Sequence, residues 1–205
     1  MLLGNGDGTF QLTKTYAGDG GVNLIAGDFN GDGILDLLFS GDDAPISLAL
    51  GNGDGTFQTP VVVATSATGC PAFSPTMLVS DFNGDGNLDF AFCAGDSIGI
   101  VLGNGDGTFQ KPTYYPVTSE RDFSFTAGDF NSDGNTDILI SDFIDGRIEI
   151  YLGNGNGTFQ PRVQVLAPGE GVGAESGAIA GDFNSDGLLD FIFENDGEIG
   201  IYLQR

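Results

Sequence analysis

Short apolar runs alternate with clusters of Gly, Asn and Asp along the whole chain. Runs such as Leu24–Phe29, Ile46–Leu50 and Val61–Ala64 are aliphatic, aromatic or β-branched and are flanked by Gly, Asn, Asp or Pro. Runs of this kind are typical of β-strands, and no segment keeps the 3.6-residue periodicity of an amphipathic helix. The pattern therefore predicts an all-β fold.

The strand pattern repeats four times with a period of about 50 residues. In each unit one strand enters an acidic loop, a second leaves it, and a Gly-Asn-Gly turn joins a third strand to a fourth. This period, with four strands per unit, predicts the blades of a β-propeller. The predicted single domain covers residues 1–205, with repeats at about 18–64, 65–117, 118–166 and 167–205 and a closing strand within 1–17.

The two ends of the chain are out of phase with the repeats. The last unit ends at Ile201–Leu203, before a fourth strand, whereas Leu3–Gln11 holds the turn that precedes such a strand. Pairing the N-terminal strand with the last blade would close a four-blade ring and bury two sheet edges. Two alternatives stay open, namely two chains that join into eight blades and a segment of a longer array.

The composition is strongly acidic, with 29 Asp and Glu against 6 Lys and Arg and a formal net charge of −23. This charge repels phosphate backbones, which argues against nucleic acid as a partner. No apolar stretch reaches the roughly 20 residues of a membrane-spanning helix. The chain has no His, so imidazole is excluded as a catalytic base and as a metal ligand. Self-repulsion at such a charge favours bound cations.

Four copies of the motif Asp-Phe-Asn-(Gly/Ser)-Asp-Gly-x-x-Asp begin at Asp28, Asp81, Asp129 and Asp182. Side-chain oxygens at positions 1, 3 and 5, a Gly at position 6 and a carbonyl at position 7 match the first part of an EF-hand loop. An Asp at position 9 closes the site in place of a distant Glu. These hard oxygens suit Ca²⁺ better than Mg²⁺ or a soft metal.

The sequence thus predicts four Ca²⁺ sites. The alternative is an Asx-rich turn without metal, but all four copies keep every side-chain ligand while positions 4, 7 and 8 vary. The predicted ligands are the side chains at positions 1, 3, 5 and 9 and the backbone carbonyl at position 7: Asp28, Asn30, Asp32, Ile34 and Asp36; Asp81, Asn83, Asp85, Asn87 and Asp89; Asp129, Asn131, Asp133, Asn135 and Asp137; Asp182, Asn184, Asp186, Leu188 and Asp190.

A second motif, Gly-Asn-Gly-Asp-Gly-Thr-Phe-Gln, occurs near the N-terminus and after the third strand of the first three units. Its acidic residue is Asp7, Asp54 or Asp106, but the fourth copy has Asn156. Because the charge is replaceable, we interpret these segments as hairpin turns rather than metal sites.

Together the two motifs resemble FG-GAP/VCBS repeats, the units of integrin α-subunit propellers and of many bacterial surface proteins. The resemblance covers essentially the whole chain. It implies a propeller with calcium on one face and an adhesive or ligand-binding role. Integrin heads have seven blades rather than four, and the Asp-x-Ser-x-Ser motif of the integrin inserted domain is absent from this sequence.

The connections on the face opposite the acidic loops vary most between units, and variable loops on a rigid scaffold usually carry recognition. We expect a glycan or protein ligand there, bound by a monomer or by a dimer that completes a larger propeller. A calcium-dependent hydrolase or lactonase and a purely structural repeat segment are the alternatives. The candidate contact residues are Phe73, Tyr114, Tyr115, Arg121, Phe123, Asp142 and Arg147.

Cys70 and Cys93 both map to this variable face in the same unit. A disulfide between them would agree with an exported protein, and the alternative is a buried free thiol. The start of the sequence lacks the charged and apolar regions of a signal peptide. The adhesive role that the resemblance implies nevertheless favours an extracellular or cell-surface location.

Overall fold

A computed structural model of the protein describes residues 2–12, 21–41, 45–65, 77–118, 123–142, 147–166, 178–195 and 198–204. Every regular element in these ranges is a β-strand, which confirms the all-β prediction. Within them, no helix long and apolar enough to cross a membrane is found.

Four antiparallel sheets follow one another along the chain, and in each sheet the strands are hydrogen-bonded in sequence order. A separate hairpin of β1 (Leu2–Gly4) and β2 (Phe10–Leu12) precedes them. The strands are, in sheet I, β3 (Gly21–Gly27), β4 (Asp36–Gly41), β5 (Ile46–Ala49) and β6 (Val61–Ala64); in sheet II, β7 (Met77–Ser80), β8 (Asp89–Cys93), β9 (Ser97–Val101) and β10 (Thr113–Pro116); in sheet III, β11 (Phe123–Gly128), β12 (Asp137–Asp142), β13 (Ile148–Tyr151) and β14 (Val163–Leu166); and in sheet IV, β15 (Ile179–Gly181), β16 (Asp190–Asn195) and β17 (Glu198–Tyr202).

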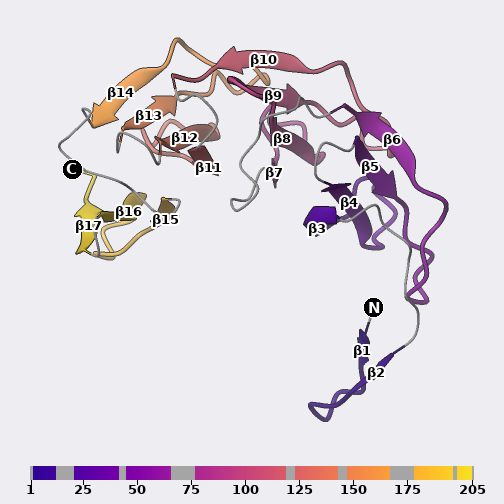
Figure 1. Ribbon diagram of the computed structural model, residues 1–205. Helices are drawn as coiled ribbons and strands as arrows, with labels where there is room; N and C mark the ends of the chain where they lie inside the picture. The colour runs from indigo at the N-terminus through magenta and orange to yellow at the C-terminus, as the bar shows by residue number, and fades with distance from the viewer. Residues whose placement is uncertain are drawn as a thin grey trace.

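The sheets are arranged as propeller blades in an open arc (Figure 1). Their first strands line the inside, where β3 contacts β7, β7 contacts β11 and β11 contacts β15, while β6, β10 and β14 lie on the outside. Among the described residues β15 does not contact β3, β17 pairs only with β16, and β1 pairs only with β2. The blade architecture is thus confirmed, whereas ring closure by the N-terminal strand is not observed and stays a prediction.

The hydrophobic core lies in the seams between neighbouring sheets. Alternate residues of one strand serve two seams, because side chains on a strand point to opposite faces of its sheet. In β8, Phe90 and Phe92 pack against sheet I, whereas Ala91 and Cys93 pack against sheet III. Sheets II and III are therefore apolar on both faces, which explains the near-continuous apolar runs in their strands.

A glycine at the centre of β9 makes room for one of these rings. A Cβ atom on Gly99 would lie 2.4 Å from Cε1 of Phe92, and one on Gly200 in sheet IV would lie 2.6 Å from Cζ of Phe193. Phe92 is fully buried, so it has little space into which to move. Glycine at this position is thus a packing requirement.

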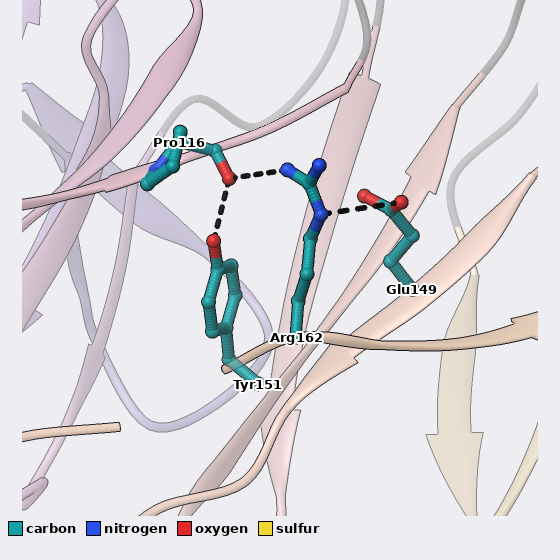
Figure 2. Close-up of polar contacts among 4 residues, drawn as sticks. All are labelled: Pro116, Glu149, Tyr151 and Arg162. Carbon is teal, nitrogen blue, oxygen red and sulfur yellow. Dashed lines mark hydrogen bonds and ion pairs between the residues drawn. The ribbon is translucent and has the colours of Figure 1, made fainter. Parts of the chain in front are cut away.

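A polar cluster spans the seam between sheets II and III (Figure 2). The carbonyl oxygen of Pro116 accepts hydrogen bonds from the Tyr151 hydroxyl at 2.5 Å and from Nη1 of Arg162 at 2.9 Å. Nε of Arg162 lies 3.5 Å from Oε1 of the buried Glu149. Burial raises the pKa of Tyr151, so the phenol remains a donor. The Pro116 carbonyl of sheet II is thereby joined to Tyr151 at the end of β13 and to Arg162 immediately before β14.

Candidate metal loops

The four acidic loops join the first and second strands of each sheet, and they lie at the same end of the sheets as the Gly-Asn-Gly hairpins. The hairpins of sheets II and III dock onto the acidic loop of the preceding sheet. The Gly107 amide donates to the Phe29 carbonyl at 3.0 Å, and the Gly157 amide donates to the Phe82 carbonyl at 3.1 Å. The ring of Phe29 lies 6.0 Å from that of Phe109, between centroids. The acidic loops of sheets I and II are therefore part of the inter-sheet seams.

The first carboxylate of each loop is the centre about which the backbone turns. Asp81 accepts hydrogen bonds from the amides of Gly84, Asp85 and Gly86 at 2.7, 3.3 and 2.8 Å. The bonds from the amides of positions 5 and 6 recur in the other three loops, on Asp28, Asp129 and Asp182. Hydrogen bonds from backbone amides, that of Gly33 foremost, lower the pKa of Asp28, which keeps this carboxylate ionised.

Positions 3 and 5 are joined to each other. In the second loop Nδ2 of Asn83 donates to Asp85 at 2.9 Å, and its Oδ1 accepts from the Asp85 amide at 2.9 Å. Asp85 also accepts from the Asn87 amide at 2.8 Å, and this bond is the largest cause of its lowered pKa. The same three contacts are present in the other loops at Asn30 and Asp32, Asn131 and Asp133, and Asn184 and Asp186.

The last carboxylate of each loop is buried and links two parts of its sheet. Asp89 accepts from the Phe82 amide and from the Gly103 amide, both at 2.8 Å. Burial raises its pKa to about 6, assisted by the negative charges of Asp85 and Asp81 and opposed by the two amides. Equivalent bridges are made by the buried carboxylates of Asp36, Asp137 and Asp190.

The backbone conformation is the same in all four loops even where the sequence differs. Position 4 is Gly31 and Gly84 in the first two loops, with φ of 72° and 73°, but Ser132 and Ser185 in the others keep φ of 59° and 62°. Residues other than glycine seldom adopt this left-handed region. The tight turn of the loop, rather than the residue type at position 4, thus determines the backbone conformation there.

The donor set of each loop fits a hard divalent cation, because three carboxylates, one carboxamide and a backbone carbonyl are all within a nine-residue turn. In the described part of the chain, however, no group of three or more acidic side chains lies close enough to hold a metal ion. The carboxylates are turned towards backbone amides instead. Side-chain rotations, including rotation of the Asn amide away from the neighbouring Asp, would be needed to bring the oxygens together.

The second motif forms hairpin turns, as predicted. Oδ1 of Asp106 accepts from the Thr108 amide at 2.9 Å and from its hydroxyl at 2.6 Å. In the fourth copy Oδ1 of Asn156 accepts the equivalent two bonds from Thr158, at 3.1 and 2.6 Å. The residue is used as a hydrogen-bond acceptor, which explains why an amide can replace the acid.

Several residues expected to contact a ligand lie in other environments. Phe123 is fully buried in the seam between sheets II and III, so its proposed contact role is wrong; it is the first residue of β11 and not part of the preceding connection. Tyr115 packs in the same seam, where its hydroxyl accepts from the Phe159 amide at 3.2 Å. Asp142 is buried, while Tyr114 is exposed on the outer strand β10.

Among the residues singled out on the predicted ligand-binding face, Arg147 and Cys93 are the remaining ones that the structure describes. Arg147 is half-buried, and its carbonyl accepts from the Asp142 amide at 2.9 Å. Phe73, Arg121 and Cys70 lie outside the described residues. Cys93 is buried and disulfide-bonded.

The cluster of Glu149, Tyr151 and Arg162 was not predicted. The sequence does contain a signal, because Glu149 is a charged residue where the third strands of the other units have Ser47, Gly99 and Gly200. A charge at a position that is otherwise small and uncharged indicates a specific partner.

Comparison with known proteins identifies the family. The sequence profile described as FG-GAP-like repeat matches residues 28–78, 81–140 and 129–193. The chain belongs to the FG-GAP-like repeat family. Each match begins at the first Asp of an acidic loop, at Asp28, Asp81 and Asp129, so the loops mark the start of the family repeat. No sequence among the curated proteins matches the chain.

Solved structures that resemble this FG-GAP-like repeat chain include the following two. One is a lectin from Agrocybe aegerita, described as specifically recognising non-reducing terminal N-acetylglucosamine; it is 23% identical with a TM-score of 0.62, and the match covers 87% of this chain and 51% of the lectin. The other is the Tc holotoxin pore of Photorhabdus luminescens, 17% identical with a TM-score of 0.53 over 95% of this chain and 9% of that one. The chain thus spans about half the length of the lectin chain, and the likeness shows a shared fold.

Proposed function

We propose that the protein is a calcium-stabilised propeller module that binds carbohydrate on the face opposite the acidic loops. The observation that carries the calcium part is the fourfold repetition of one loop architecture with the same carboxylates in the same roles. A turn needs only one Asx acceptor, as the Gly-Asn-Gly hairpins demonstrate, so three carboxylates per loop exceed what turn formation requires. Their mutual repulsion is offset by a divalent cation.

Within each loop the residues would have two roles, as ligands of the cation and as an anchor to the sheet. Positions 1, 3 and 5 and the carbonyl of position 7 would supply oxygens to the cation, and the buried carboxylate of position 9 would anchor the site to the sheet. The bound cation would neutralise charge and hold the loop closed. Its contribution would be structural, because the first three loops are each hydrogen-bonded to the hairpin of their own sheet through Asp36, Asp89 and Asp137.

The calcium part is tested by isothermal titration calorimetry on metal-free protein, with four sites expected per chain. Asp85→Asn should lower the number of sites by one, whereas the matched hairpin variant Asp106→Asn should leave four. EDTA should lower the melting temperature, because an ion that binds only the folded state adds about 2.7 kcal/mol per site at a hundred times its dissociation constant. Equal melting temperatures with and without calcium, and no heat of binding, would refute the calcium part.

The carbohydrate part rests on the fold shared with the lectin and on the variation of the loops opposite the calcium face. Calcium-loaded protein should bind a glycan microarray, and glycans that end in N-acetylglucosamine are the first to examine. Hydrogen exchange with and without a bound glycan should then show protection in the connections opposite the acidic loops, of which residues 94–97 are described. Silence across the array, or protection confined to the acidic-loop face, would overturn this part while leaving the calcium part intact.

A further inference from the structure

In the described part of the chain, both ends of the arc present an apolar sheet face that no other sheet covers. At the N-terminal end the face of sheet I turned away from sheet II carries Leu24 and Leu35, and we name it the leading face. At the C-terminal end the face of sheet IV turned away from sheet III carries Ile179, Ile199 and Ile201, and we name it the trailing face. All five side chains are exposed.

The repeats show what covers the leading face elsewhere in the chain. Leu24 has the repeat position of Met77 and Phe125, yet it is 67% exposed while they are 5% and 6% exposed, because each of them packs against the preceding sheet. Leu35 has the position of Leu88, whose Cδ1 lies 2.6 Å from where a Cβ of Gly27 would be, in the preceding sheet. A leading face is therefore a surface that fits the trailing face of another sheet.

The trailing face shows the same contrast. Ile199 is 72% exposed, whereas Ile98, its equivalent in sheet II, is 1% exposed and packs in the seam with sheet III. Ile201 corresponds to Ile100, which is buried in that seam as well. The chain thus carries both halves of one more inter-sheet seam, separated at the two ends of the arc (Figure 1).

The unpaired hairpin supplies a second, independent match. Sheet IV has three strands where the other sheets have four, and the β1–β2 hairpin has the sequence that joins a third strand to a fourth. Its Phe10 is 65% exposed, whereas the equivalent Phe159 lies 5.8 Å from the ring of Phe82 and 5.3 Å from that of Tyr115. The positions equivalent to Phe82 and Tyr115 in sheet III are Phe130 and Val165, and Val165 is exposed.

We propose that two copies of the chain join into one ring of eight sheets, in which the leading face of each copy covers the trailing face of the other and the hairpin of each copy adds the missing fourth strand to sheet IV of the other. The interface repeats the seam that already exists three times within the chain, so its shape and polarity are known from the described residues. The two junctions are related by a twofold axis and close on themselves, as in most soluble oligomers. A second copy would cover both exposed faces and give the hairpin a sheet to pair with. The proposal does not depend on calcium or glycan binding.

The test is the mass of the protein by analytical ultracentrifugation at several concentrations and near-physiological salt. The wild-type chain should sediment at twice the monomer mass, and Leu24→Asp and Ile199→Asp should each sediment at the monomer mass. Val61→Asp is the matched control. Its repeat equivalents Thr113 and Val163 are exposed as well, although sheets I, II and III have different neighbours, so this position lies outside the contacts between sheets. Circular dichroism checks that each variant is folded, which is expected since the changed residues are exposed.

Mixing Leu24→Asp with Ile199→Asp distinguishes the proposed dimer from other arrangements. A pair formed from Leu24→Asp and Ile199→Asp keeps one intact junction, so the mixture should regain part of the dimer that neither variant forms alone. A wild-type monomer at every concentration would overturn the proposal and point to a ring closed within one chain. Open-ended oligomers, or face variants that remain dimeric, would overturn it as well.

Discussion

Asp89→Ala should lower the free energy of unfolding by about 2–4 kcal/mol in calcium-free protein. The carboxylate is fully buried and accepts from the amides of Phe82 and Gly103, both at 2.8 Å. Its removal leaves two donors without a partner, at about 1–3 kcal/mol each. Part of this loss is recovered, because burial of the charged group is itself unfavourable, as its pKa of about 6 indicates. The backbone bridge should outweigh that recovery.

The assay is urea unfolding at pH 8 in EDTA, where Asp89 is ionised and metal does not contribute. Asp85→Ala is the matched control from the same loop. It also removes two hydrogen bonds, from the Asn87 amide and from Nδ2 of Asn83, but Asp85 is exposed and water can satisfy both donors. Its loss should stay below about 1 kcal/mol. Equal losses for the two variants in EDTA would show that the buried bridge does not stabilise the sheet as we reason.

Three further substitutions test individual contacts by urea unfolding. Arg162→Met should cost about 1–3 kcal/mol, because Glu149 would remain buried without its charged partner, and adding Glu149→Gln should restore part of the loss; no recovery in the double variant would contradict the pairing. Ser132→Gly should raise stability by up to about 1 kcal/mol, since glycine adopts φ near 60° without strain, and a loss would refute this. Gly99→Ala should cost about 1–3 kcal/mol through its clash with Phe92, whereas an unchanged midpoint would show that the ring can move.

The sequence allowed the strands and the acidic loops to be predicted because both depend on local chemistry. Short apolar runs between turn formers were enough for the four sheets, and the roles of Asp28 and Asp32 in turning the loop follow from their spacing. The period of about 50 residues also indicated the blade architecture. These features depend on residues close together in the chain.

What could not be predicted depends on contacts between distant residues. Phe123 follows a variable connection, and nothing local distinguishes a loop residue there from the first residue of β11. Arg162 meets Glu149 across neighbouring strands and Pro116 across a seam, so its role becomes visible only when the sheets are packed. The buried carboxylate of Asp89 likewise has a distant partner, because the Gly103 amide that it accepts from belongs to a hairpin fourteen residues away.

The first two acidic loops also contact the hairpin of the next sheet, and this position has a consequence for stability. Gly107 of one hairpin donates to Phe29 of the preceding loop, so a loop held closed presents a fixed acceptor and a fixed ring to the next sheet. In repeat proteins the total stability is close to a sum of unit and nearest-neighbour interface terms. An ion that stiffens a loop therefore adds to an interface term as well as to the unit that binds it. We thus expect calcium at the second loop to strengthen the packing of sheet II on sheet III, through the bond from Gly157 to Phe82.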